Sequence, residues 1–222
     1  MKKVFIRSGI RYDYLIRDKN KDFLNELGKH HVSGQLKVAP EHCSAKVLDK
    51  MGKPHIEGYK EFQREFYSAT KRAGKEQYLV PSLMSSHPGS TLKEAIELAM
   101  FLKENKIHPE QVQDFYPTPA TISTCMFYTG LDPYTMEEVY VPKTPEEKAM
   151  QRALLQYFKP ENRRIIISAL IKAGRTDLIG KGPKCLVEPD GEYLRRQNNR
   201  SNTAKRGQND KWQNGKQKRK RR

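Results

Sequence analysis

Short apolar runs alternate with longer amphipathic segments along residues 1–117. Alternating or continuous apolar runs of this length predict strands, and apolar residues recurring every three or four positions predict helices. The predicted strands are residues 3–8, 34–39, 77–84 and 111–116. The predicted helices are residues 18–31, 44–51, 58–73 and a segment from Thr91 to Leu102. Strands alternating with helices are typical of βαβ units, so the pattern predicts an α/β fold with a parallel sheet.

Local signals refine this picture. Thr91 and Glu94 have the spacing of a capping box, which marks the start of a helix. Pro81 lies inside a predicted strand, and because proline lacks an N–H group it predicts an edge strand or a bulge. Four strands are too few to close an eight-stranded barrel. We therefore expect a partial (β/α) barrel, which is a piece of something larger.

The periodic pattern breaks down after Tyr116, where prolines become frequent. Residues 121–128 form one β-like run. Helical patterns return at Thr144, which is placed to cap a helix with Pro145 in its first position and Glu147 completing a second capping box. Another helix is expected from Pro160 to Gly174. Residues 118–186 are therefore predicted to form a small, irregular and helical C-terminal domain.

The last segment, residues 187–222, has few apolar residues and many cations. It holds 12 Lys and Arg against 4 Asp and Glu, whereas the whole chain has a net charge of +16. Such a segment buries too little apolar surface to offset the entropy of ordering, so we expect a disordered basic tail. Its densest cations are Lys216, Lys218, Arg219, Lys220, Arg221 and Arg222. They predict weak, non-specific RNA binding through phosphate contacts; the alternative is a tail that only improves solubility.

Three cysteines, Cys43, Cys125 and Cys185, lie far apart in the sequence. This spacing fits neither a zinc site nor an iron–sulfur loop, and three unrelated reduced thiols are expected. His42 and His87 have no partner at ligand spacing, so no metal site is predicted. No apolar run is long enough to cross a membrane, and the first residues lack the apolar core of a signal peptide. We expect a soluble, cytoplasmic protein.

Polar residues follow the predicted strands at the positions where α/β sheets bind ligands. The candidates are Arg7, Ser8 and Arg11 after the first strand, Lys37 and Glu41 in and after the second, and Ser86, His87 and Gly89 after the third. The carboxyl ends of parallel strands share one edge, so these residues should converge. A cationic pair, a carboxylate and a Ser/Gly-rich helix start suit a ligand that carries a carboxylate, a ribose and a flat base.

Several motifs, in a fixed order, resemble one known family. They are residues 8–11 (SGIR), 36–42 (LKVAPEH), 47–54 (VLDKMGKP), 85–91 (SSHPGST), 111–119 (QVQDFYPTP), 123–126 (STCM) and 148–154 (KAMQRAL). Together they are similar to the second half of the barrel and the extra C-terminal domain of YgiQ-like radical S-adenosylmethionine (SAM) proteins. The resemblance covers about residues 3–180.

The resemblance implies a partial barrel in which a [4Fe–4S] cluster reductively cleaves SAM to a 5′-deoxyadenosyl radical. It implies that Arg7, Ser8 and Arg11 lie near the SAM carboxylate and ribose. It also implies that Lys37 and Glu41 line the pocket, and that Ser86, His87 and Gly89 lie near the adenine. This chain departs from the pattern because the CxxxCxxC loop and the glycine-rich motif of the second strand are absent.

The expected organisation is a partial radical SAM barrel over residues 1–117, a family-specific domain over 118–186 and a basic tail over 187–222. The expected function is the C-terminal part of a radical SAM protein of unknown substrate. Such a chain would be inactive alone and would need a cluster-bearing N-terminal half or partner chain. The alternative is an RNA- or ribosome-associated module that acts through the tail. The sequence leaves open whether this chain by itself is an enzyme.

Simpler interpretations of the candidate residues also stay open. Arg7 and Arg11 could pair with surface carboxylates and contact no ligand. Residues 86–89 could form a plain turn that leads from a strand into a helix. A structure distinguishes these alternatives by showing which polar groups already have partners.

Overall fold

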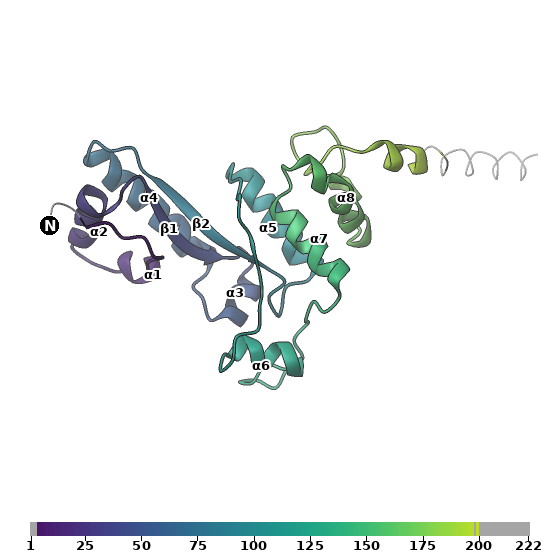
Figure 1. Ribbon diagram of the computed structural model, residues 1–222, viewed down its shortest axis with the longest axis horizontal. Coiled ribbons are helices and arrows are strands. Elements are labelled where there is room, and N and C mark those ends of the chain that lie inside the picture. Colours follow the sequence, from purple (N-terminus) through teal and green to yellow (C-terminus); the bar gives the residue numbers. More distant parts are fainter. Residues whose placement is uncertain (1–3, 198, 200–222) are drawn as a thin grey trace, which may run out of the picture.

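The structure is a computed structural model, which describes residues 4–197 and residue 199. Its sheet has three parallel strands in the order β1-β2-β3, and β1 and β2 lie side by side along most of their length (Figure 1). The strands are β1 (Gln35–Glu41), β2 (Tyr78–Ser85) and β3 (Gln113–Asp114). Within the described residues this sheet does not close into a barrel. The prediction of an α/β fold with a parallel sheet is confirmed.

The helices that follow the first two strands also match the sequence pattern. They are α3 (Ala45–Met51), α4 (Ile56–Arg72) and α5 (Leu92–Glu104). The capping box at the start of α5 is present: Thr91 Oγ1 accepts a hydrogen bond from the Lys93 amide at 3.1 Å, and the Thr91 amide donates to Glu94 Oε2 at 2.9 Å. The cap satisfies amide groups that have no partner inside the helix.

The pairing between β1 and β2 is irregular near Pro81. Val38 pairs with Pro81, but Glu41 pairs with Leu83, so β1 holds one more residue than β2 in this interval. β3 pairs only with Met84 and Ser85, which leaves Pro81 with a partner strand on one side. Both facts explain how a residue without an N–H group fits into β2. The irregularity that Pro81 predicts is confirmed.

The prediction of a strand at residues 3–8 is wrong for the part that the structure describes. Residues 4–8 have no regular structure, and Val4 and Phe5 are exposed. Only Ile10 forms a parallel bridge, to Val38 of β1. An apolar run becomes a strand only where a neighbouring strand satisfies its backbone groups. Instead of joining the sheet, Ile6 donates its amide to the carbonyl of His31 at 2.9 Å.

The helix predicted at residues 18–31 is shorter and changes type. It begins at α2 (Asp22–Glu26) and continues as a π-helix, η1 (Leu27–His31). The short helix α1 (Tyr12–Leu15) precedes it and was not predicted. The side chain of Gln77 donates to the carbonyls of Gly28 (2.9 Å) and Val32 (3.0 Å). These bonds supply partners for carbonyl groups at the helix end that lack them within the helix.

The predicted strand at residues 121–128 is a helix, α6 (Ile122–Thr129). Thr121 Oγ1 accepts from the Thr124 amide at 3.2 Å, and Gly130 ends the helix with a φ of 70°. Capping at both ends therefore overrides the strand preference of the threonine and aromatic residues between them. The remaining helices are α7 (Pro145–Leu155), η2 (Pro160–Asn162), α8 (Arg163–Lys172) and η3 (Thr176–Leu178).

The start of the predicted tail is ordered, which corrects the expected disorder from residue 187. Residues 191–197 are helical, and Asp190 Oδ1 accepts from the Tyr193 amide at 2.7 Å. Val187 is buried in the second core described below, so the segment is attached to the fold. Residue 198 and residues 200–222 lie outside the described residues, and with them the six cations from Lys216 to Arg222.

Two apolar cores share one helix. In the first core, α4 and the inner residues of β1 and β2 pack together; its members include Leu36, Val38, Tyr59, Phe62, Phe66, Leu83, Leu98 and Leu102. In the second core, α5 packs against α7 and α8; its members include Leu92, Ala95, Ile96, Ala99, Met150, Leu154, Ile166 and Leu170. α5 contributes to both cores and lies between the sheet and the C-terminal helices (Figure 1).

In the part of the chain that the structure describes, no helix is both long and apolar enough to cross a membrane.

Candidate functional site

Two strand ends carry buried polar atoms that have no partner. Glu41 is the last residue of β1, and Ser86 directly follows β2. Both have a left-handed backbone with a φ of 63°, which is uncommon for residues other than glycine. Glu41 Oε2 and Ser86 Oγ are buried and lack a hydrogen bond, which costs free energy unless another group binds there. Both atoms lie at the carboxyl edge of the sheet, where α/β folds bind ligands.

A small pocket lies beside Lys53, the ion-pair partner of Glu41. Lys53 Nζ donates to the carbonyl of Ala39 at 3.0 Å and lies 3.4 Å from Glu41 Oε1. A pocket of about 170 Å³ lies between residues 10–13 and residues 51–54, with Ala39 in its wall. Burial, together with the carboxylates of Asp13 and Glu41, raises the pKa of Tyr12 to about 12. Lys53 therefore pairs with Oε1 of Glu41 and leaves Oε2 available for a hydrogen bond to another group.

Arg11 lines the same pocket but is already paired. Its guanidinium donates to both carboxylate oxygens of Asp13, at 2.9 and 2.6 Å, and lies 4.6 Å from the centre of the Tyr14 ring. The hydrogen bond from Arg11 lowers the pKa of Asp13. Arg11 thus pairs with a carboxylate two residues away, as its simpler interpretation expects. Arg7 and Ser8 are exposed.

Lys37 lies apart from these residues. It occupies the middle of β1, opposite Val80, and its side chain is exposed. It lines a separate pocket of about 590 Å³ together with Gln35, Leu79 and Pro81. The structure therefore places Arg11 at one pocket, which Lys53, the partner of Glu41, also lines, and it places Lys37 at another.

The loop after β2, residues 86–90, is buried along its whole length and is held by residues far along the chain. Gln151 Oε1 accepts from the Ser86 amide at 3.1 Å and from Ser90 Oγ at 3.0 Å, and Gln151 Nε2 donates to the Ser90 carbonyl at 2.8 Å. Gly89 donates its amide to the Tyr140 carbonyl at 2.7 Å. Its φ is 92°, and a Cβ here would lie 3.2 Å from Lys50 Cγ, so glycine is needed.

His87 is 3% exposed and is oriented by two hydrogen bonds. Its Nδ1 lies 2.8 Å from the Pro88 carbonyl, which can only accept, so Nδ1 carries the proton. Nε2 then accepts from Ser123 Oγ at 2.8 Å. The Phe115 ring packs edge-on at 5.0 Å, and burial lowers the pKa of His87 to about 4. His87 is therefore neutral at physiological pH.

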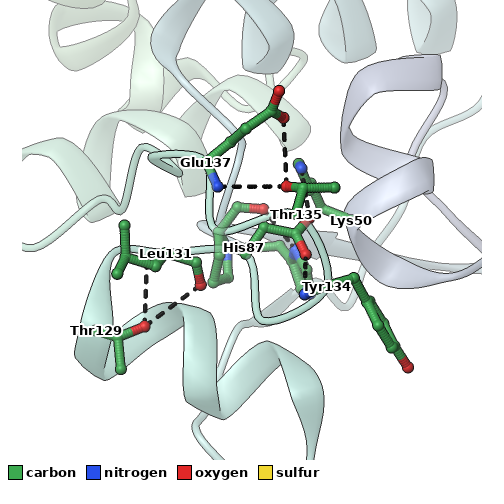
Figure 2. Close-up of polar contacts among 9 residues, drawn as sticks. Lys50, His87, Thr129, Leu131, Tyr134, Thr135 and Glu137 are labelled. Atoms are coloured by element: carbon green, nitrogen blue, oxygen red, sulfur yellow. Dashed lines mark hydrogen bonds and ion pairs between the residues drawn. The ribbon is translucent and has the colours of Figure 1, made fainter.

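A lysine and an aspartate connect α3 to the segment beyond α6. Lys50 Nζ donates to Asp132 Oδ2 at 2.5 Å, and the Tyr134 amide donates to Asp132 Oδ1 at 2.9 Å. The hydrogen bond from Lys50 lowers the pKa of Asp132. Figure 2 shows Lys50 and His87 beside this segment, with the Tyr134 ring pointing away from them. The segment thus lies against the loop after β2 and covers it on one side (Figure 2).

The sequence did not indicate Ser123, Asp132, Tyr140 or Gln151 as site residues. Each reaches the loop after β2 or its neighbour Lys50 from α6 or beyond, so no local spacing connects them. One signal was available for Gln151. It lies three residues before Leu154 on the buried stripe of α7, where a polar residue needs an internal partner.

The described residues do not fit an iron–sulfur cluster. Cys43 is buried, Cys125 is exposed and Cys185 is half-buried, and all three are free thiols. No group of three or more Cys, His, Asp or Glu within the described part is arranged to hold a metal. In contrast, the unpaired oxygens of Glu41 and Ser86 are suited to binding the hydroxyl and nitrogen groups of an organic ligand.

Comparison with known families gives the affiliation of the chain. A family described as "Domain of unknown function (DUF3362)" matches residues 110–222, just over half of the chain. The chain belongs to this family. The DUF3362 region includes Ser123, Asp132, Tyr140 and Gln151, that is, the residues that hold the loop after β2 and the neighbouring Lys50.

Similar proteins extend the comparison to nearly the whole chain. A UPF0313 protein of Clostridium perfringens (strain 13 / Type A) is 61% identical over 202 residues, which cover 91% of this chain and 30% of the relative. A UPF0313 protein of Clostridium botulinum (strain 657 / Type Ba4) is 60% identical over 187 residues, which cover 84% and 29%. UPF0313 proteins are the YgiQ-like family. This DUF3362 chain therefore spans about 30% of the length of these relatives.

Proposed function

We propose that this chain forms one side of the SAM-binding site of a radical SAM protein whose substrate is unknown. The [4Fe–4S] cluster would be held by residues outside this chain, in a longer protein or in a partner chain. The observation that carries the proposal is the pair of buried, unpaired oxygens, Glu41 Oε2 and Ser86 Oγ, at the ends of two adjacent parallel strands.

The chain's own residues would bind and orient the ligand. The free oxygen of Glu41 can accept a hydrogen bond from a ribose hydroxyl or an ammonium group, while Lys53 keeps the carboxylate in place. The Ser86 hydroxyl can donate to or accept from the edge of a base. When bound to SAM, the cluster would supply the electron that cleaves it.

The proposal predicts that the charge of Glu41 is needed for SAM binding. The test protein is a chimera in which this chain replaces the 202-residue segment that it matches in the C. perfringens relative. The chimera is reconstituted anaerobically with iron and sulfide, and 5′-deoxyadenosine is measured. Glu41→Gln is expected to raise KM for SAM by about tenfold or more, because a hydrogen bond to a charged group is lost.

Glu61→Gln serves as the control, since Glu61 is exposed on α4 and removing its charge should leave KM unchanged. If the C. perfringens relative and the chimera are both reconstituted and form no SAM-dependent 5′-deoxyadenosine, the radical SAM proposal is wrong. If both are active and Glu41→Gln binds SAM normally, Glu41 is not a ligand.

We also propose a second function, non-specific RNA binding by the basic tail. Its support is the charge of residues 187–222, 12 Lys and Arg against 4 Asp and Glu. Deleting residues 200–222 is expected to weaken binding of single-stranded RNA at least about tenfold at low salt. The affinity of the intact chain should fall steeply as salt is raised. Filter binding measures both, and an affinity that neither the deletion nor salt changes would exclude this function.

A further inference from the structure

Gln151 is completely buried, and both ends of its side-chain amide are used on one loop. Its oxygen accepts from the Ser86 amide and the Ser90 hydroxyl, and its nitrogen donates to the Ser90 carbonyl. The side chain therefore spans residues 86–90 and fixes the distance between the first and last residues of the loop. A buried amide with all these partners has one orientation, because any rotation leaves polar groups unpaired.

Other residues of the DUF3362 region hold the rest of the loop. The Tyr140 carbonyl accepts from the Gly89 amide at 2.7 Å, and Ser123 Oγ donates to His87 Nε2 at 2.8 Å. Just before the loop, Ser85 Oγ donates to Asp114, which also pairs with Arg152 of α7. The loop is thus bound along its length by side chains and carbonyls from residues 114–152.

Ser86 is the exception within this network. The Ser86 amide donates to Gln151, and the residue as a whole is 1% exposed. Its hydroxyl oxygen is buried and has no hydrogen-bond partner. Its left-handed backbone, with a φ of 63°, is unfavourable for serine and needs outside support. The bond from its amide to Gln151 gives that support and at the same time directs the hydroxyl to a place where only a further group can pair with it.

We propose that Gln151 is a positioning residue, through which the DUF3362 region presets the loop after β2 so that Ser86 Oγ can bind the ligand. In this chain the DUF3362 region would then support a ligand-binding loop that follows β2, a strand outside that region. The identity of the ligand as SAM rests on the function proposed above, whereas the effect of Gln151 on the loop does not.

The first test measures the loop directly, in the full chain and without ligand. Gln151→Met keeps the size of the side chain and removes all three hydrogen bonds. The amide hydrogen of Ser86 is expected to exchange with solvent at least about tenfold faster in this variant, and the amides of Gly89 and Ser90 to follow. The matched control is Gln156→Met at the C-cap of the same helix, because Gln156 donates to the Glu110 carbonyl at 2.7 Å and not to the loop.

The second test measures SAM binding in the reconstituted chimera described above. Gln151→Met is expected to raise KM for SAM by about tenfold and to change kcat little, since it disturbs a contact made on binding. Gln151→Glu gives a further readout. A buried glutamic acid is protonated at low pH, and it can then accept from Ser86 and donate to Ser90 as glutamine does. As the pH rises, this side chain loses its proton and can no longer donate to Ser90, so KM for SAM of this variant should rise with pH. KM of the parent should not show this rise.

The outcomes separate this inference from the proposed function. If Gln151→Met exchanges like the parent or like Gln156→Met, Gln151 does not hold the loop and the inference is wrong. If exchange speeds up while KM for SAM stays the same in an active chimera, the loop is held but does not serve the ligand, which also overturns the inference. If exchange speeds up and the parent chimera has no SAM-dependent activity, the support role is upheld and only the SAM assignment fails.

Discussion

Leu98→Ala is expected to lower the free energy of unfolding by about 3 kcal/mol and to destabilise both cores together. Leu98 is fully buried in the first core, and Ile96, two residues earlier on α5, is buried in the second. Because one helix contributes to both cores, neither can lose α5 and stay folded. Ile96→Ala should therefore have an effect of similar size, although it removes contacts on the opposite side.

Hydrogen exchange during urea denaturation measures this coupling. Amides of α4 and α8 should lose protection at the same urea concentration in the parent, and each variant should shift both by the same amount. Lys93→Ala, at an exposed position of α5, is the control and should change stability by less than about 0.5 kcal/mol. If Leu98→Ala destabilises α4 but leaves α8 unchanged, the cores unfold separately, in line with the expected domain boundary after residue 117.

Stability is expected to fall steeply between pH 6.5 and 4.5. Burial lowers the pKa of His42 and of His87 to about 4, and both side chains are at most 3% exposed. In the unfolded chain these groups titrate near 6.5. Below that pH the unfolded state therefore binds more protons than the folded state, and protons favour unfolding. Each histidine should cost about 2 to 3 kcal/mol of stability at pH 4.5 relative to pH 7.

His87→Asn isolates one of the two contributions, since asparagine does not titrate. The variant will differ from the parent at pH 7 because the contact with Ser123 changes, so the slope with pH is the relevant quantity. Urea denaturation at pH 7, 5.5 and 4.5 should show about half of the acid loss in the variant. Carboxylates with lowered pKa values, such as Asp114, act mainly below this range. Parallel pH profiles for parent and variant would contradict the assignment.

The pattern of apolar residues predicted the elements that pack against something on one face. β1, β2, α4 and α5 each carry an apolar face that meets another element in a core, so their periodicity has a physical cause. The predictions failed where neighbouring strands or capping groups, and not the composition of the segment, decide its secondary structure. Residues 4–8 have strand composition but no neighbouring strand, and residues 122–129 have threonines and aromatics but caps at both ends.

The candidate site was predictable only in part. Glu41 and Ser86 were predicted because they follow strands, and topology places strand ends together. The sequence allowed two interpretations of Arg11, pairing with a carboxylate or binding a ligand. It could not distinguish them, because both use the same exposed guanidinium, which in the structure pairs with Asp13. The position of Gln151 on the buried stripe of α7 indicates that it needs an internal partner, but the partners themselves could not be inferred. They lie 61 and 65 residues earlier, and only the packing of α7 onto the sheet joins them to Gln151.

The long separation between Gln151 and its loop has a consequence for biosynthesis. Ser86 leaves the ribosome 65 residues before Gln151, a delay of about 3 to 13 seconds at the usual pace of about 5 to 20 residues per second. β1, β2 and α4 can pair during this interval, whereas the left-handed turn at Ser86 must wait for α7. β1 and β2 are thus made well before α7, and the loop acquires its final shape only after α7 has been synthesised.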